Sequence, residues 1–372
     1  MDPLEDVLAL TGASSYVSAG MVAGGRWAVR FEAPGGVKFN SVRRGSCLVH
    51  VDGSEPIRLR EDDAFLLTQP RGFVLASAED VSPVPASLIF REAAARTGER
   101  EARARGERKA EAHGEEREAQ TRGDERENKT RAERETEASG GERKALTRGD
   151  EREDQRRGER ETEARAGERV AMARAGVGDD VEVIGGGFTF NERGRTLLLP
   201  NLPPILHVPG DAPEAATVRW VLQRIGAELG RGDVGATVVA EHLAMVMFVE
   251  VLRLHLRSGG AAGWLAGLAD PVVAEALRAM HRRPAHPWTV TALAHTARVS
   301  RSTLAARFKD LVGTGPVDYL TGWRIEIAAQ RLTETSDTLS TIARQVGYGS
   351  ESALSTAFKR VTGQTPRDYR RG

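Results

Sequence analysis

The chain has a single cysteine, Cys47, among its 372 residues, and aromatic residues make up only 5% of it. One cysteine cannot form an intrachain disulfide, which excludes a disulfide-stabilised secreted domain and favours a reducing compartment. Long hydrophobic runs are also missing. Charged residues interrupt even the most apolar stretch, 238–256, which is too polar to span a membrane. Residues 1–10 lack the bases and apolar core of a secretory signal. The sequence therefore predicts a cytoplasmic protein with no membrane partner.

The net charge is zero, yet the charge is unevenly distributed along the chain. Residues 271–372 carry 15 lysines and arginines against 8 acidic residues. Residues 1–90 and residues 171–270 each carry 8 basic residues against 11 acidic ones. A basic C-terminal segment beside acidic segments favours a phosphate-rich partner that binds at one end only.

Short alternating apolar runs dominate residues 1–90, for example at 27–31, 47–51 and 57–60. Asp52-Gly53 separates the last two runs, and this dipeptide strongly favours a hairpin turn. Residues 183–190 and 196–199 have the composition of returning strands. Short strands joined by hairpin turns predict an antiparallel sandwich or barrel within residues 1–210, interrupted by an insert at 91–178.

The insert has an unusual composition. Between residues 99 and 169, 42 of 71 residues are charged, 20 of them basic and 22 acidic. Glycine recurs in a Gly-Glu-Arg-like unit, and no apolar stripe exists that tertiary packing could bury. We predict a disordered low-complexity insert, and a helical spacer is the alternative.

Residues 211–260 change to helical periodicity. Val218, Val221, Leu222 and Ile225 form one apolar stripe, and a second helix should follow a glycine-rich turn, with Val239, Leu243, Val246 and Met247 along it. Two adjacent amphipathic helices predict a helical hairpin. The apolar density of 243–256 exceeds a single stripe, which predicts that the hairpin also forms a homodimer interface.

The C-terminal block contains the same pattern twice, about 50 residues apart in the sequence. In each copy a short apolar helix precedes a tight turn, a serine suited to cap the next helix, and a second helix with leucine and phenylalanine four residues apart. Ser300, Leu304 and Phe308 mark the first copy. Tandem units of this kind are typical of helix-turn-helix DNA binding.

The opposite faces of these two second helices are the candidate DNA-binding surface. Small side chains there suit thymine methyls or single acceptors, Glu351 suits a cytosine amino group, and the basic residues, Arg307 included, suit phosphates. The candidate residues are Arg301, Ser302, Thr303, Ala305, Ala306 and Lys309 in the first unit, and Glu351, Ser352, Ser355, Thr356, Lys359 and Arg360 in the second.

Residues 271–372 resemble the DNA-binding domain of the AraC/XylS family of bacterial transcription regulators. The likeness is clearest at 342–348 (Ile-Ala-Arg-Gln-Val-Gly-Tyr) and at 358–370, from Phe-Lys-Arg-Val to Asp-Tyr-Arg. It implies two recognition helices that enter successive major-groove faces of double-stranded DNA, joined by a linker helix. The first unit departs from the pattern, because Arg298 stands at the turn position that Gly347 occupies in the second.

Residues 1–90 and 181–210 resemble the cupin-like effector domain of many family members, through 35–39, 44–47, 62–67 and 199–204. Catalytic cupins bind a metal with a His-x-His pair, a Glu and a later His. Here His50 lies between two valines, and Phe73 occupies the neighbourhood of the later His. We therefore expect no metal, no cofactor and no catalytic residue. The candidate effector-binding residues are Trp27, Arg43, His50 and Phe73.

Together these patterns predict a multidomain α+β protein. A cupin-like barrel with a helical hairpin precedes an all-α tandem helix-turn-helix domain at 271–372. We expect a sequence-specific transcription regulator that responds to a small-molecule effector and binds promoter DNA as a homodimer, with RNA polymerase as a further candidate partner. Two alternatives stay open. One is a cupin enzyme fused to a DNA-binding module, and the other is an architectural DNA binder without a ligand.

Overall fold

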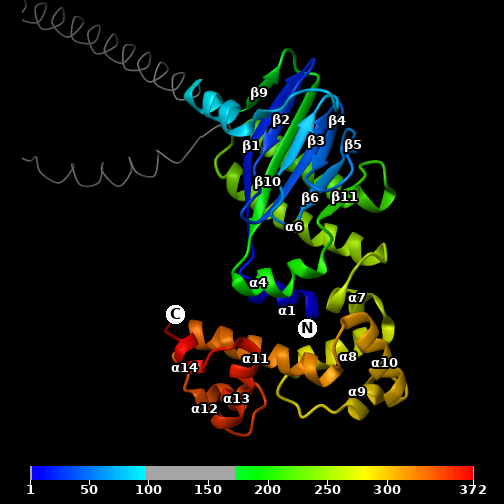
Figure 1. Ribbon diagram of the computed structural model, residues 1–372, viewed down its shortest axis with the longest axis vertical. Coiled ribbons are helices and arrows are strands. Elements are labelled where there is room, and N and C mark those ends of the chain that lie inside the picture. Colours follow the sequence, from blue (N-terminus) through cyan, green and yellow to red (C-terminus); the bar gives the residue numbers. More distant parts are fainter. Residues whose placement is uncertain (1, 97–171, 372) are drawn as a thin grey trace, which may run out of the picture.

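The computed structural model describes residues 2–96 and 172–371. A β-rich half and an all-helical half follow one another along the long axis of the molecule (Figure 1). Most of the predicted insert, 97–171, lies outside the described residues. Its predicted edges are structured, because residues 86–96 are helical and β9 spans Ala173–Gly176. Regular structure therefore continues for several residues inside both predicted ends of the insert.

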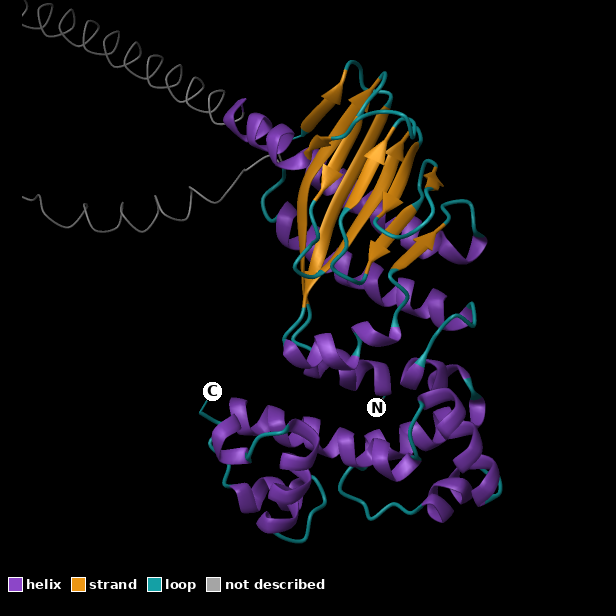
Figure 2. Ribbon diagram, viewed as in Figure 1, coloured by secondary structure: helices purple, strands orange, loops and turns teal. Residues whose placement is uncertain are grey.

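Two sheets form the β-rich half. The six-stranded sheet has the order β11-β6-β3-β10-β1-β9, and the five-stranded sheet has the order β5-β4-β7-β2-β8. Antiparallel pairing prevails, but β9 pairs with β1 and β8 with β2 in parallel. Of the two predicted arrangements, sandwich and barrel, the β-rich half has two sheets as in a sandwich, with a parallel pair at one edge of each sheet (Figure 2). The remaining strands are β1 (Ser14–Gly24), β2 (Ala28–Phe31), β3 (Val37–Arg44), β4 (Cys47–Val51), β5 (Ile57–Leu59), β6 (Ala64–Leu67), β7 (Phe73–Ala76), β8 (Val84–Pro85), β10 (Val181–Thr189) and β11 (Ile205–Val208).

The predicted hairpin between β4 and β5 is confirmed. Cys47 pairs with Leu59 across it, and Gly53 has a φ of 77° that a side chain would make costly. Alternation along β3 directs Val42 into the core between the sheets and Phe39 into a second core on the outer face of the six-stranded sheet. The strand is therefore covered on both faces.

Helices cover that outer face. Helix α5 (Ala216–Arg231) and helix α6 (Ala236–Arg257) form the predicted hairpin, and both contact the six-stranded sheet. The predicted stripe of α6 was partly wrong, because Val239 and Val246 are exposed. Ala240 and Ala244 are buried instead, since small side chains let the helix backbone approach the sheet, where Phe248 packs on Phe188.

Short helices close the end of the sandwich that faces the all-helical half. These are α1 (Pro3–Leu10), α4 (Glu192–Leu197) and the 3-10 turn Leu199–Asn201, while a second 3-10 turn, Pro213–Ala215, leads into α5. The strand expected at 196–199 is therefore wrong. The Asn191 side chain accepts a hydrogen bond from the Gly194 amide at 2.9 Å and starts a helix there.

The all-helical half begins after α7 (Gly263–Ala269). Its helices are α8 (Pro271–Arg282), α9 (Val290–Thr296), α10 (Arg301–Val312), α11 (Pro316–Glu334), α12 (Leu339–Gln345), α13 (Glu351–Thr362) and α14 (Pro366–Tyr369). Two separate cores form, one around Leu304 and Phe308 and the other around Leu354 and Phe358. Helix α11 contributes to both, as the predicted linker helix should. None of the helices in the described ranges is long and apolar enough to cross a membrane.

Candidate DNA-binding surface and effector cavity

The two candidate recognition helices, α10 and α13, begin in the same way. Ser300 accepts a hydrogen bond from the Thr303 amide at 3.1 Å, and Ser350 accepts one from the Ala353 amide at 3.2 Å. Each helix ends at a glycine in the left-handed region, Gly313 or Gly363. The repeated sequence pattern therefore produces two equivalent capped helices.

Most of the predicted contact residues face solvent. Ten of them are exposed, and only Ala305 and Ser355, which hold equivalent positions, are half-buried. Arg301, Lys309 and Glu351 make no hydrogen bond or ion pair with another side chain in the described ranges, and the same holds for Lys359 and Arg360. Each unit thus presents small polar side chains flanked by uncommitted charges, which suits groove edges and phosphates.

Arg307 is an exception to the predicted phosphate contacts. Its guanidinium lies 3.3 Å from the Asp270 carboxylate, whose other oxygen caps helix α8. Val361, which the helical spacing after Leu354 and Phe358 predicts to face inward, is instead 44% exposed. The residue that completes the inner face of α13 is Ala357, one turn earlier.

The two units are held in a fixed relationship by the linker helix and one loop. Arg324 on α11 donates hydrogen bonds to the carbonyls of Pro284 and His286, at 2.7 and 2.8 Å. Its guanidinium also lies 5.8 Å from the ring centre of Tyr348 in the second unit. A Cβ on Gly347 would lie 2.6 Å from the Ala285 carbonyl oxygen, so this glycine allows a close approach.

The linker helix also packs against the β-rich half. Trp323 belongs to the same core as α1, α5 and α6, and it is 6% exposed. His281 of α8 stacks on Trp323 with ring centres 4.1 Å apart. His281 Nδ1 lies 3.1 Å from the Asp6 carboxylate of α1, and its Nε2 lies 2.8 Å from the Tyr319 hydroxyl. Burial lowers the pKa of His281, although Asp6 opposes this shift.

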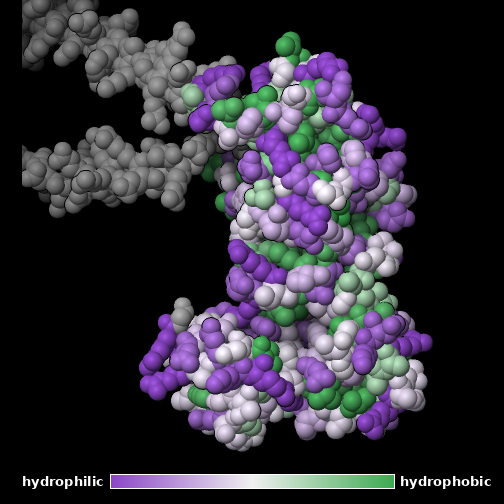
Figure 3. All heavy atoms as spheres, in the orientation of Figure 1, coloured by the Kyte–Doolittle hydropathy of each residue, from purple (hydrophilic) through white to green (hydrophobic). Residues whose placement is uncertain are grey.

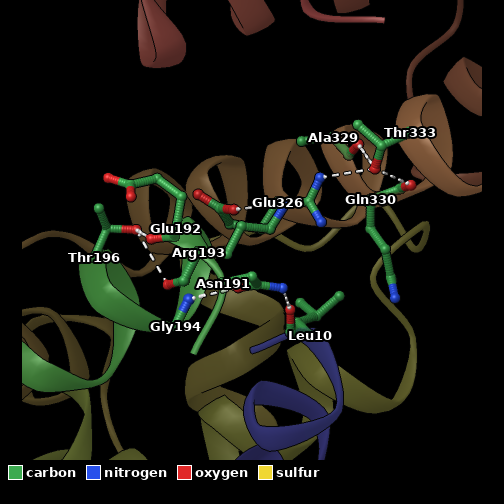
Figure 4. A network of polar contacts seen from close by, with 10 residues as sticks. All are labelled: Leu10, Asn191, Glu192, Arg193, Gly194, Thr196, Glu326, Ala329, Gln330 and Thr333. Atoms are coloured by element: carbon green, nitrogen blue, oxygen red, sulfur yellow. Dashed lines mark hydrogen bonds and ion pairs between the residues drawn. The ribbon is translucent and has the colours of Figure 1, made fainter. Parts of the chain in front are cut away.

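A second polar contact joins the halves through α4 (Figure 4). Arg193 Nε lies 3.8 Å from the Glu326 carboxylate on α11, and its terminal nitrogen donates to the Thr333 hydroxyl at 3.3 Å. Burial raises the pKa of Glu326, and Arg193 opposes that shift. Apolar side chains gather at the waist between the halves, while hydrophilic ones cover much of the helical half in this view (Figure 3).

A cavity of about 360 Å³ lies inside the sandwich. Both sheets contribute to it, and the helical segment 86–96 closes one side with Phe90. Four side chains carry polar groups, namely Ser18, Lys38, Asn40 and Ser87, and the rest of the lining is mainly apolar. An outer hollow of about 300 Å³ adjoins it and shares Lys38. Volumes and linings of this kind are typical of small-molecule sites.

The four predicted effector residues do not come together there. His50 is exposed on the five-stranded sheet, and Arg43 points to the outer face of the other sheet, where its guanidinium lies against Gly226. Trp27 is buried in the core between the sheets without lining the cavity. Phe73 lines the outer hollow and stacks on Phe31 at 4.6 Å. Only Phe73 is therefore near the cavity, and sequence reasoning missed Lys38 and Asn40.

A second cavity, of about 400 Å³, lies between β11 and α6, with the unpartnered Nε2 of His255 in its lining. Within the described residues no group of three or more His, Cys, Asp or Glu side chains is placed to bind a metal. Burial raises the pKa of the Cys47 thiol to about 12, so this thiol is a poor nucleophile at neutral pH.

Comparison with known proteins identifies the chain. A cupin family model matches residues 2–126 and 138–257, and a helix-turn-helix domain model matches residues 293–372. An AraC-like transcription regulator of Streptomyces lividans is 48% identical over all of this chain and 98% of its own length. One of Streptomyces antibioticus is 47% identical over all of this chain and 99% of its own. The transcriptional regulator AlkR of Acinetobacter baylyi is 35% identical over 46% of this chain and 58% of its own. Since two relatives match over the full length of the chain, this protein is a member of the AraC-like transcription regulators, with an N-terminal cupin domain and a C-terminal helix-turn-helix region.

Proposed function

We propose that this DNA-binding regulator is controlled by a small molecule that binds inside the cupin sandwich. The observation that carries the proposal is the burial of Trp323, which lies on the helix that links the two reading units and packs into the core of the effector half. A ligand that shifts α1 or α4 against this helix would move both recognition helices together, because α11 links the two units.

The exposed faces of α10 and α13 are the proposed DNA contacts. Their small side chains suit sequence readout through methyl groups and single hydrogen bonds, and their uncommitted bases suit phosphate contacts. Since Arg324 and the loop at 284–286 fix the two units, they should reach DNA as one rigid reader of two groove segments.

We also propose a homodimer that forms through the helical hairpin. Three valines of α6 are exposed although this helix is otherwise well packed, and Trp220 of α5 is 59% exposed. The valines are Val238, Val239 and Val246, with exposed fractions of 57%, 41% and 46%. Exposed apolar side chains on two neighbouring helices support a surface that a second copy covers.

The proposal is tested by mixing the purified full-length protein with fragmented host DNA and sequencing what it retains. We expect a few enriched sites upstream of genes, and we expect a ligand of the sandwich cavity to change their occupancy. Retention without sequence preference would instead favour the ligand-free architectural binder. Saturable ligand binding that leaves DNA retention unchanged would contradict the regulatory link.

The fused-enzyme alternative has no observation in its favour. The cavity side chains with titratable or nucleophilic groups are Ser18, Lys38 and Ser87, and Lys38 contacts Ser18 rather than an acid or base partner. This alternative is tested by incubating a ligand of the cavity with the protein. We expect to recover the ligand chemically unchanged.

A further inference from the structure

The cavity inside the sandwich contains a positive charge without a counter-charge. Lys38 Nζ donates to Ser18 Oγ at 3.0 Å, and in the described parts of the chain no carboxylate forms an ion pair with it. Glu32 lines the outer hollow, but the base that interacts with it is Arg30, which itself pairs with Asp52 at 2.7 Å. Burial lowers the pKa of Lys38 to about 8, because few groups near this ammonium replace its hydration.

Asn40 adds an unused donor on the same wall. It lies two residues beyond Lys38 on β3, so both side chains point between the sheets. Asn40 is 4% exposed, and among the residues that the structure describes its Nδ2 has no hydrogen-bond partner. A buried amide without a partner is unfavourable, and an acceptor atom on a ligand would remove that cost.

The rest of the lining restricts the class of ligand. Phe31, Met21 and Phe90 offer an apolar wall, which suits a hydrocarbon or aromatic body. A polyol would need more hydrogen-bonding groups than this wall offers, and a dianion such as a phosphate monoester would need more than one cation. A single carboxylate matches one ammonium and one amide donor.

We propose that the cavity binds a small organic acid, with its carboxylate on Lys38 Nζ and Asn40 Nδ2 and its apolar body against Phe31, Met21 and Phe90. This inference rests on the proposed function and names the chemical class of its effector. The cavity beside His255 fits less well, because its lining contains both Glu214 and Arg257 and so carries no excess charge of one sign.

The test compares acids with their neutral amides on the full-length protein. Benzoate with benzamide, and hexanoate with hexanamide, are titrated while the thermal unfolding midpoint is followed. We expect saturable stabilisation by at least one acid, with at least tenfold weaker binding of its amide. Equal binding of acid and amide, or no stabilisation by either acid, would overturn the proposal, and this comparison needs no variant.

Variants then locate the site. Lys38→Met keeps the length of the side chain and removes its charge, so it should weaken acid binding at least tenfold and leave amide binding within twofold. Arg58→Met removes an exposed charge of the other sheet and is the matched control, which should bind acids like the wild type. Acid binding that persists in Lys38→Met but is lost in His255→Leu would move the site to the second cavity and overturn the assignment.

The experiments distinguish an incorrect ligand class from an incorrect proposed function. A neutral compound that binds as tightly as any acid and changes DNA retention would overturn the proposal that the ligand is an organic acid. The regulatory role would stand. An acid that binds through Lys38 and leaves DNA retention unchanged would retain the ligand class and contradict the regulatory role.

Discussion

The hydroxyl of Tyr319 lies 2.8 Å from Nε2 of His281, and this contact joins the linker helix to α8 where both helices meet α1 of the β-rich half. Asp6 of α1 lies on the other ring nitrogen of the same histidine, at 3.1 Å. A neutral imidazole serves both partners, because Nδ1 can donate to the carboxylate while Nε2 accepts from the hydroxyl. One buried side chain thus connects two domains.

This arrangement predicts that stability falls in mild acid. Burial lowers the pKa of His281 below its ordinary value of 6.5, so below that pH the unfolded chain binds a proton that the folded chain still excludes. The free energy of unfolding should therefore decrease as pH falls through 6.5. Urea unfolding of the full-length protein at a series of pH values measures this dependence of the free energy of unfolding on pH.

A variant pair assigns the effect to this residue. His281→Leu leaves Asp6 and Tyr319 without their partner, so it should destabilise the protein by about 1–3 kcal/mol at neutral pH and flatten the acid-side dependence. The exposed His50→Leu should keep the wild-type profile. An unchanged acid-side slope in His281→Leu would show that another group is responsible.

The two helix-turn-helix turns predict opposite responses to substitution. Gly347 has a φ of 88° and approaches the Ala285 backbone, so Gly347→Ala should destabilise the protein by about 1–2 kcal/mol or more. Arg298 occupies the equivalent turn with a φ of 56°, where a side chain is strained, so Arg298→Gly should stabilise by up to about 1 kcal/mol. Denaturant unfolding midpoints compare them, and stabilisation by Gly347→Ala would contradict this account.

Salt dependence of DNA binding tests the proposed phosphate contacts. Lys309→Ala and Lys359→Ala should each weaken binding to all sequences and lower the slope of log affinity against log salt by about one. Arg278→Ala is the matched control, because Arg278 is paired with Glu275 at 2.7 Å on helix α8. If the lysine variants kept the wild-type slope, these side chains would not contact phosphates.

The proposed dimer surface predicts a change of oligomeric state. Val246→Glu places a charge among the exposed valines of α6, and burying that charge unpaired in a dimer interface is costly. Sedimentation velocity should show a dimer for the wild type and a monomer for this variant. Val317→Glu alters a valine of similar exposure, 43%, on α11 and should stay dimeric. A wild-type protein that sediments as a monomer would contradict the proposed homodimer.

The helical half could be predicted well because its signals are local. Ser300 and Ser350 lie immediately before their helices, and the leucine and phenylalanine of each unit lie four residues apart, so sequence spacing alone places caps and cores. No local sequence pattern predicts the contact between Trp323 and the β-rich half, because this contact depends on how two separately folded parts meet.

The lining of the sandwich cavity could not be predicted, because alternation in a strand does not say which face points inward. Polar residues at 38 and 40 between apolar neighbours usually indicate a solvent-facing side. In β3 the outer face is covered by α5 and α6, so Lys38 and Asn40 face the interior instead. The same ambiguity placed His50 and Arg43 in a cavity that neither side chain reaches.

Helix α11 also has a consequence for how members of this family can vary in length. Each residue of an α-helix turns the chain by about 100° and advances it by about 1.5 Å. One residue added between Leu320, which packs in the first unit, and Ala328, which packs in the second, would rotate one recognition helix by that angle relative to the other. Insertions and deletions should therefore be absent from this segment of α11.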